Sequence, residues 1–333
     1  GINWDSGYGF HPDERSFYLR ADCTYSLLSQ SPGYQECIQQ YPETETGFPS
    51  LSVFFDSDRS PLNPRWFPLG SVLIYVLVFF RSVIELFTDI GAMDMRFVGR
   101  PLSALADVGS VFMVYVLGSR LFSKKVGLLA AALTALAVIH IQNSHFFRPE
   151  TFSILALLTV FWALLRMLDR RRLRDSLLLG FMVGLAMAPK VSVLPLVVPL
   201  LLAYGYCIVD AAGARWSGIT PEIARKVAVH AGVAGLLAVM VFFISSPYAL
   251  LDFGAFFGDL RAQAEMARNA DVWPFTVQYI NTPTFLYQIQ QTTIWGLGIP
   301  LGIISWLSIP FTVWVALKYP ATRRADMLLL AWV

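Results

Sequence analysis

The chain has 333 residues, of which 56% are hydrophobic and only 14% are charged, and its formal net charge is +2. A soluble globular domain carries about 25% charged residues, so this composition excludes an ordinary soluble protein. Two runs, residues 126–141 and 191–209, are apolar on every face of a helix, as in segments buried in lipid. The basic residues are sorted by loop and form no single patch, so the charge indicates no nucleic-acid partner. We therefore expect an all-α fold, a polytopic transmembrane helical bundle.

Residues 1–99 form the first predicted domain, a long extracytoplasmic loop. Within it, residues 68–87 are apolar enough to resemble a membrane span, but they include Arg81 and Glu85. A charge at the membrane centre costs about 2.5–3.5 kcal/mol on insertion scales, so we expect a helix that lies on or dips into the outer interface. Cys23 and Cys37 lie in the same loop, where a disulfide in an oxidising compartment and two unpaired thiols are both open.

Residues 100–333 form the second predicted domain, the transmembrane bundle. We expect seven complete spans and the start of an eighth near residue 326, the complete ones at residues 100–121, 126–142, 150–168, 176–189, 191–210, 228–246 and 297–317. The segment 176–189 is short for a span, which needs about 20 residues, and Pro189 ends it. Since the chain opens with Gly1 and ends inside an apolar run, we expect terminal parts of the protein to be missing.

The loops beyond residue 100 alternate in charge, which predicts their side of the membrane. One set of loops carries nearly all the basic residues, namely Arg120, Lys124, Lys125, Arg166, Arg170, Arg171, Arg172, Arg174, Arg215, Arg225, Lys226, Lys318, Arg323 and Arg324. The other set holds only Arg148, Lys190, Arg261 and Arg268. Lys and Arg mark cytoplasmic loops, so the second set is expected to face the cell exterior, the periplasm or a lumen, together with residues 1–99.

The sequence His11-Pro12-Asp13-Glu14 brings two adjacent acids to this outer side. Adjacent side chains of a helix point in different directions, so we expect one acid to face a substrate and the other to hold the loop. A carboxylate near low-dielectric surroundings has its pKa raised by desolvation, which suits a general base, and His11 is a supporting residue. The alternative is structural, because acids also favour the first turn of a helix.

The loop at residues 142–150 gathers further polar groups between two spans. Pro149 fits a helix start, which leaves Glu150 in the first turn, where it could orient a hydroxyl nucleophile or help to hold a divalent cation. Each polar residue also has a structural alternative: Glu150 can complement the helix dipole, His145 can form interfacial hydrogen bonds, and Arg148 can reach a lipid headgroup.

Lys190 is the lone basic residue of an outer hairpin, where it can bind a phosphate headgroup or simply extend to the interface. Arg100 and Asp107 lie two turns apart on one span and share a face. We expect Asp107 to be structural and to pair with Arg100 or another polar side chain. The sequence has no Gly-rich phosphate loop, metal-finger spacing or nucleophile elbow, so a nucleotide-sugar site is not supported.

Four motifs in order resemble the GT-C glycosyltransferases that use lipid-phosphate-linked sugars, in particular protein O-mannosyltransferases and lipid A aminoarabinose transferases. They are His11–Glu14, Gly99–Asp107 (GRPLSALAD), residues 126–150, which contain VGLLAAAL and QNSHFFRPE, and Gly184–Lys190 (GLAMAPK). The resemblance implies a GT-C-like bundle with interfacial helices in the first outer loop. It also implies a polyprenyl-phosphate sugar as the donor substrate.

The resemblance also implies roles for individual residues. An Asp of the first outer loop is catalytic in this family, which assigns that role to Asp13. The second acid across the cavity corresponds to Glu150, where the family more often has Asp, and the longer side chain leaves its geometry and any metal role open. The Lys after the Gly-Leu-Ala sequence contributes to donor-phosphate binding, which implicates Lys190, with Arg100 and Arg148 as further candidates.

Two functional hypotheses follow. The first is an inverting glycosyltransferase that acts on the periplasmic or extracellular side of a bacterial plasma membrane, with Asp13, Glu14 and Glu150 as the candidate catalytic acids. Its partners are membrane lipid, the lipid-linked donor and an acceptor of unknown class, and a divalent cation is the one cofactor left open. The second is a transporter or lipid flippase without chemistry. Polar residues gathered at one face, with no inverted repeat, favour the enzyme.

Overall fold

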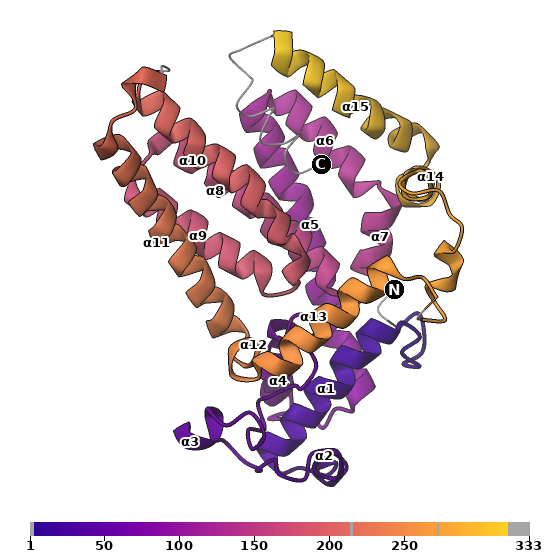
Figure 1. The fold of residues 1–333 in the computed structure, drawn as a ribbon. Helices are drawn as coiled ribbons and strands as arrows, with labels where there is room; N and C mark the ends of the chain where they lie inside the picture. The colour runs from indigo at the N-terminus through magenta and orange to yellow at the C-terminus, as the bar shows by residue number, and fades with distance from the viewer. Residues whose placement is uncertain (1–2, 214–215, 272, 319–333) are drawn as a thin grey trace. The chain divides into compact units, whose positions relative to one another are not determined.

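In the computed structural model, the regular elements of the described residues, which are 3–213, 216–271 and 273–318, are all helices (Figure 1). This confirms the predicted all-α class. The chain divides into two compact units. The first unit comprises Gly1–Ala106, Asn143–Thr151 and Phe243–Pro283, and the second comprises Asp107–Gln142, Phe152–Phe242 and Thr284–Val333. This division interleaves segments of the chain, whereas the predicted boundary at residue 100 follows the expected membrane topology.

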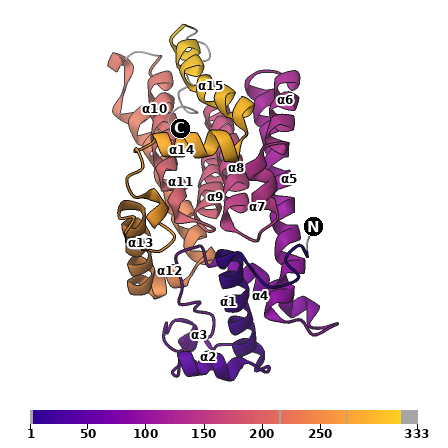
Figure 2. The ribbon, with the colours of Figure 1, turned by 90° about the vertical axis from the view of Figure 1, so that its right-hand side faces the viewer.

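The first unit is built on α1 (Pro12–Ser29), which packs against α4 (Val72–Ile84). The two helices lie side by side in both ribbon views (Figures 1 and 2). The unit is completed by the start of α5 (Arg96–Leu121) and by further helices, namely α2 (Tyr34–Gln40), α3 (Leu51–Phe54), η1 (Ala92–Met95), α12 (Tyr248–Leu251), α13 (Phe253–Arg268) and η4 (Val277–Tyr279). Its core consists of fully buried side chains, including Phe17, Tyr18, Ile74, Leu77, Met95, Phe147 and Tyr248.

The predicted interfacial segment at residues 68–87 forms α4, a helix of 13 residues. At 1.5 Å per residue it is about 20 Å long, shorter than the roughly 30 Å of a bilayer core. Leu73, Ile74 and Leu77 are buried, while Phe79 remains 63% exposed. The helix therefore has one apolar face packed inside the unit and further apolar residues at the surface. Its location at the outer interface stays a prediction.

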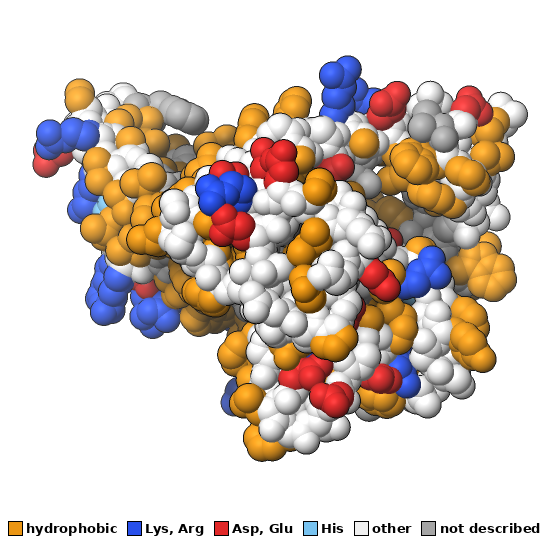
Figure 3. Space-filling view, turned by 90° about the horizontal axis from the view of Figure 1, so that it is seen from below, with side chains coloured by type: hydrophobic (Ala, Val, Ile, Leu, Met, Phe, Trp, Pro, Cys, Tyr) orange, Lys and Arg blue, Asp and Glu red, His pale blue; other side chains and the backbone are white. Residues whose placement is uncertain are grey.

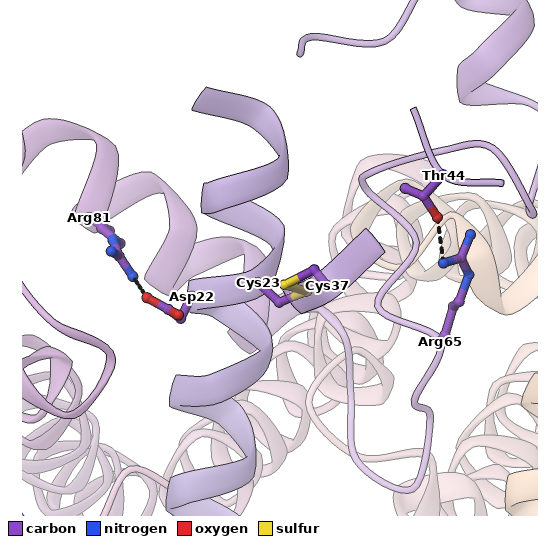
Figure 4. Close-up of a disulfide and its surroundings, with 6 residues drawn as sticks. All are labelled: Asp22, Cys23, Cys37, Thr44, Arg65 and Arg81. Atoms are coloured by element: carbon purple, nitrogen blue, oxygen red, sulfur yellow. Dashed lines mark hydrogen bonds and ion pairs between the residues drawn. A yellow bond between two sulfur atoms is a disulfide. The ribbon is translucent and has the colours of Figure 1, made fainter. Parts of the chain in front are cut away.

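A disulfide joins Cys23 of α1 to Cys37 of α2, which resolves the two alternatives that the sequence left open. The Cα atoms of the two cysteines are 5.8 Å apart. Figure 4 shows this bond beside the ion pair between Asp22 of α1 and Arg81 of α4. Arg81 also pairs with Glu85 at 3.1 Å, so the charges that argued against a membrane crossing are used in packing α4 on α1.

The surface of the first unit also carries isolated apolar side chains, among them Phe48 and Leu51, which are 89% and 78% exposed. In the space-filling view of Figure 3, hydrophobic side chains stand in separate patches among acidic and basic ones. Scattered apolar residues of this kind are ordinary on protein surfaces.

The second unit contains the long apolar helices. Its elements are the remainder of α5, then α6 (Lys124–Ala135), α7 (Val138–Ser144), α8 (Pro149–Arg170), α9 (Leu173–Met187), η2 (Val191–Leu196), α10 (Val197–Ala211), η3 (Trp216–Gly218), α11 (Pro221–Ser245), α14 (Leu286–Gln291), η5 (Thr292–Gly296) and α15 (Ile299–Lys318). Its core gathers Leu117, Val160, Leu164, Met167, Leu179 and Leu196. Close helix packing depends on Gly180 and Gly184 of α9, where added Cβ atoms would collide with Ala234 and Ala238 of α11.

Five helices of the described chain are long and apolar enough to cross a membrane, namely Ala92–Leu121, Pro149–Arg170, Val191–Ala211, Pro221–Ser245 and Ile299–Lys318. The bent pair Lys124–Ala135 and Val138–Ser144, with an angle of 61°, makes a sixth if it counts as one broken span. These account for six of the seven predicted spans. The segment 176–189 forms α9, whose 15 residues are too few for this group, and the predicted eighth span lies outside the described residues.

Candidate functional site

A buried arginine holds two carboxylates together in the first unit. Arg100 of α5 donates from Nη1 and Nη2 to the two oxygens of Asp5, at 3.0 and 2.7 Å. It also donates from Nε and Nη2 to the two oxygens of Glu14, at 3.0 and 2.8 Å. The side chains of Asp5 and Glu14 are 0% exposed and that of Arg100 is 2% exposed. The guanidinium of Arg100 thus bonds both oxygens of each carboxylate. These paired hydrogen bonds offset the free-energy cost of burying the three charges.

Asp5 organises the loop that leads into α1. Its carboxylate accepts hydrogen bonds from the amides of Gly7, at 3.2 Å, and Gly9, at 3.1 Å. Both glycines have positive φ angles, +85° and +62°, which favour glycine over other residues. The hydrogen bonds from Arg100, aided by those two amides, lower the pKa of Asp5 from 3.8 to about 2. Asp5 is therefore ionised at neutral pH and fixes the approach to residues 11–14.

Glu14 ties α1 to the loop at residues 143–151. Besides the Arg100 contacts, its Oε1 accepts hydrogen bonds from the Tyr18 hydroxyl and the Phe147 amide, both at 2.9 Å. Burial, followed by the negative charge of Glu14, raises the pKa of Tyr18, which stays a neutral donor. Gly99 permits this packing, because a Cβ at that position would lie 2.8 Å from both Phe147 and Tyr18. Glu14 thus has its carboxylate oxygens occupied inside the protein.

Asp13 points away from this buried network. It occupies the first turn of α1 behind His11 and Pro12, and the roughly 100° rotation per residue of a helix separates its direction from that of Glu14. Its side chain is 41% exposed. The geometry agrees with the expectation that one acid of the pair faces outward while the other holds the loop.

Arg148 lies between Asp13 and a second carboxylate. Its Nε is 3.8 Å from Oδ2 of Asp13 and 3.1 Å from Oε2 of Glu150. The Arg148 side chain is 24% exposed and that of Glu150 is 23% exposed, so both remain partly accessible. The structure therefore brings Asp13 of α1 together with Arg148 and Glu150 of the loop. Glu14 fixes the same loop through the Phe147 amide.

His11 and several aromatic rings border this cluster. Burial, followed by the nearby positive charge of Arg148, lowers the pKa of His11, against the opposing effect of Asp13, Glu14 and Glu150. The imidazole is therefore neutral at pH 7, and it packs on Phe146 with ring centroids 4.7 Å apart.

Three more aromatic side chains surround this edge of the loop, namely Trp4, Tyr8 and Phe10. Trp4 meets the ring of Phe146 edge-on at 5.4 Å, and Tyr8 stacks on Phe10 at 5.7 Å. Tyr8 and Phe10 are 73% and 65% exposed. They form an accessible aromatic border beside Asp13, and such rings can contact an apolar or sugar face.

The other predicted site residues have different positions. Arg100 belongs to the buried network rather than to an accessible phosphate site. His145 is exposed on the loop. Lys190 lies in the second unit, where it occupies the position directly before η2. Asp107 is also in the second unit, and its carboxylate lies 2.6 Å from Nδ1 of His140. Of the two expected partners, Arg100 or another polar side chain, the structure therefore shows the second.

Asp5 is the residue of this network that the sequence interpretation missed. A usable signal was present, because Asp followed by Gly at the second and fourth positions is typical of a carboxylate that caps a turn. Its partner Arg100 is 95 residues away, and no local pattern reveals such a pairing.

The arrangement does not suit a divalent cation between Asp13 and Glu150. A metal ion needs the carboxylate oxygens to converge on it, and the guanidinium of Arg148 occupies that place. Across the described residues, no group of three or more His, Cys, Asp or Glu side chains has a metal-binding arrangement. Arg148 supplies the positive charge that faces Asp13 and Glu150.

Comparison with known families adds a match over much of the chain. The model of the family described as dolichyl-phosphate-mannose-protein mannosyltransferase matches residues 76–245, slightly more than half of the sequence. The matched segment includes Arg100, Arg148, Glu150 and Lys190, and the His11–Glu14 motif precedes it. The comparison with curated proteins found no match.

Proposed function

The chain belongs to the dolichyl-phosphate-mannose-protein mannosyltransferase family of GT-C glycosyltransferases, and from this membership we propose that it transfers a sugar from a polyprenyl-phosphate lipid to an acceptor hydroxyl, with Asp13 as the general base. It is an integral membrane protein with an all-helical bundle. The family favours transfer chemistry over the alternative of a transporter or flippase without chemistry.

The assignment of Asp13 as the general base rests on the different environments of the two adjacent acids, Asp13 and Glu14. Glu14 is fully buried and its oxygens accept hydrogen bonds from three protein groups. Asp13 is accessible and faces Arg148. A general base must be able to reach the proton that it abstracts, and of the two acids Asp13 meets that requirement.

The proposed step is a direct displacement at the anomeric carbon. The acceptor oxygen forms a bond to that carbon while Asp13 takes the hydroxyl proton. The bond between the anomeric carbon and the donor phosphate oxygen breaks, and its electron pair leaves with the polyprenyl phosphate. One displacement of this kind inverts the anomeric configuration. General base catalysis contributes about 10²–10⁴-fold, and positioning of the two substrates supplies more.

The leaving phosphate needs positive charge that is free to approach it. Arg148 is partly exposed and adjacent to Asp13, which supports a contact with the donor. Lys190 is the second candidate, and its approach to the same substrate remains part of the proposal. Arg100 is a weaker candidate than the sequence suggested, because its guanidinium is engaged by Asp5 and Glu14. We assign Arg100 and Glu14 a positioning role.

Glu150 completes the proposed site by orienting Arg148. Their 3.1 Å contact places the guanidinium between the two acids, so Glu150 acts on the substrate through Arg148. His11, neutral and packed on Phe146, supports the first turn of α1 that carries Asp13. No step of this mechanism passes through a metal ion.

Two observations support action on the outer face of the membrane. The disulfide between Cys23 and Cys37 lies in the same unit as Asp13, and disulfides persist in oxidising compartments. The strongly basic loops belong to the other set of connections, which the charge distribution predicts to be cytoplasmic. The sugar and the acceptor are not specified by these arguments.

The test is a transfer assay with the purified full-length protein, a panel of polyprenyl-phosphate sugars and candidate acceptors, followed by mass analysis of the products. We expect a mass increase of one sugar on the acceptor with at least one donor, and its loss in Asp13→Asn. Transfer from a nucleotide sugar in the absence of any lipid-linked donor would contradict the proposed donor class.

A further inference from the structure

A cavity in the second unit lies at the ends of three long helices, and none of the candidate site residues lines it. It has a volume of about 100 Å³ and is lined mainly by residues of α8, α10 and α11, which are neighbours in both ribbon views (Figures 1 and 2). Met167, Cys207 and Val227 provide an apolar interior. Arg171, Lys226 and His230 line it as well, so the cavity combines apolar and cationic groups.

The position of the cavity along the helices is set by the chain. Arg171 directly follows α8, Ala211 is the last residue of α10, and Lys226 lies in the second turn of α11. These three helix ends adjoin the loops that carry most of the basic residues, which the charge rule places in the cytoplasm. The cavity therefore lies where the apolar part of a membrane helix meets a polar, strongly basic surface.

The acids around these loops are largely neutralised by particular arginines. Asp169 pairs with Arg120, Asp175 with Arg166, and Asp210 with Arg171. In residues 169–175 and 210–226, one acid, Glu222, remains, whereas five exposed cations form no ion pair among the described residues, namely Arg170, Arg172, Arg174, Arg225 and Lys226. This leaves an excess of positive charge around the cavity, and one of these cations, Lys226, lines it.

We propose that this cavity binds an anionic phospholipid, with the phosphate at Lys226 and the start of an acyl chain on Met167, Cys207 and Val227. Basic pockets between transmembrane helices on the cytoplasmic side suit such headgroups, because the cations attract the phosphate while the apolar lining accepts the chain. A soluble phosphate compound would satisfy only the cations. The site is separate from the proposed transfer reaction and does not depend on it.

The chain offers a matched pair of variants for the test. Lys226→Glu reverses a charge that lines the cavity, and Arg225→Glu reverses the neighbouring exposed charge, which does not line it. Both variants change the net charge equally and lie on the same helix. Binding of phosphatidylglycerol, with phosphatidylcholine as the neutral comparison, is measured by native mass spectrometry of the full-length protein after release from detergent.

We expect wild type to retain phosphatidylglycerol over phosphatidylcholine, Lys226→Glu to weaken that retention about tenfold, and Arg225→Glu to change it less than about twofold. Glycerol phosphate in excess should not displace the lipid. Equal losses in both variants would indicate diffuse surface attraction and overturn the proposal, as would no loss in either. Displacement by glycerol phosphate would overturn the lipid assignment. A circular dichroism spectrum and a size-exclusion profile check that each variant is folded.

A second variant tests the apolar half of the site. Val227→Trp fills the cavity without changing any charge. We expect it to reduce phosphatidylglycerol retention while glycerol phosphate binding stays unchanged, and undiminished lipid retention would contradict a chain in this cavity.

Discussion

The guanidinium of Arg100 contacts both carboxylate oxygens of Glu14, with Nε to Oε1 at 3.0 Å and Nη2 to Oε2 at 2.8 Å. The same guanidinium makes two more hydrogen bonds to Asp5. These buried contacts hold the start of α1 against α5 and leave the neighbouring Asp13 at the surface. The proposed catalytic position thus depends on a charge network that itself does not face the substrate.

Replacing Arg100 by Met should strongly destabilise the protein. The substitution leaves two buried carboxylates without their cation, and breaking a buried ion pair costs about 3–5 kcal/mol. The measurement is the midpoint of thermal unfolding in detergent. Arg15→Met, at an exposed position of α1, is the control and should leave the midpoint nearly unchanged. An equal shift in both variants would mean that the buried network contributes little.

The ionisation of Asp5 predicts an acid-dependent loss of stability. Its pKa is lowered from 3.8 to about 2 in the folded protein, so the carboxylate contributes stability above the unfolded value. This contribution, about 2 kcal/mol, disappears as the pH falls from about 4 to about 2. Unfolding of wild type and Asp5→Asn is compared across that range. The difference between them should shrink toward acid pH, and a constant difference would argue against the lowered pKa.

Gly99 should not tolerate even a methyl group. An added Cβ would lie 2.8 Å from the buried Phe147 and Tyr18, and overpacking of this kind costs about 1–3 kcal/mol. Gly99→Ala should therefore lower both stability and transfer activity, because Phe147 belongs to the loop that carries Arg148. Gly232→Ala on α11 meets no atom within 4 Å and should be neutral or stabilising. Two harmless substitutions would show that the loop adapts freely.

Loss of the disulfide should destabilise the first unit. Cys23 and Cys37 are 14 residues apart, and a loop of about 15 residues corresponds to roughly 3 kcal/mol in the chain-entropy description. The double variant Cys23→Ser and Cys37→Ser should unfold at a lower temperature than wild type. Reductant should lower the midpoint of wild type and leave that of the double variant unchanged, whereas an effect on both would point to another cause.

The hydrophobic pattern of the sequence was sufficient to predict most of the long apolar helices. The long apolar segments appear as α5, α8, α10, α11 and α15, because burial in lipid selects continuous apolar runs. The segment 176–189 was harder to judge, since its composition resembles a span while α9 has only 15 residues. For this segment, its length and the position of Pro189 indicated a helix too short for an ordinary span, whereas composition alone did not.

Within the candidate site, local relationships were predictable and distant ones were not. The different directions of Asp13 and Glu14 follow from helical geometry, and Arg148 lies close to Glu150 because they are two residues apart. The role of Arg100 was not predictable, since its partners Asp5 and Glu14 are 95 and 86 residues away. A lone arginine near a membrane surface resembles a phosphate ligand until its buried partners are known.

The comparison of Asp13→Asn with Glu14→Gln tests the central claim most directly. Gln at position 14 keeps an oxygen for the Tyr18 hydroxyl and the Phe147 amide, so it mainly weakens the contact with Arg100. The measurement is the turnover of a polyprenyl-phosphate sugar per folded molecule, together with the unfolding midpoint. Asp13→Asn should keep the midpoint and lose about 10²–10⁴-fold in turnover, while Glu14→Gln should lower the midpoint and keep turnover within about tenfold. Full turnover by a folded Asp13→Asn variant would contradict the account.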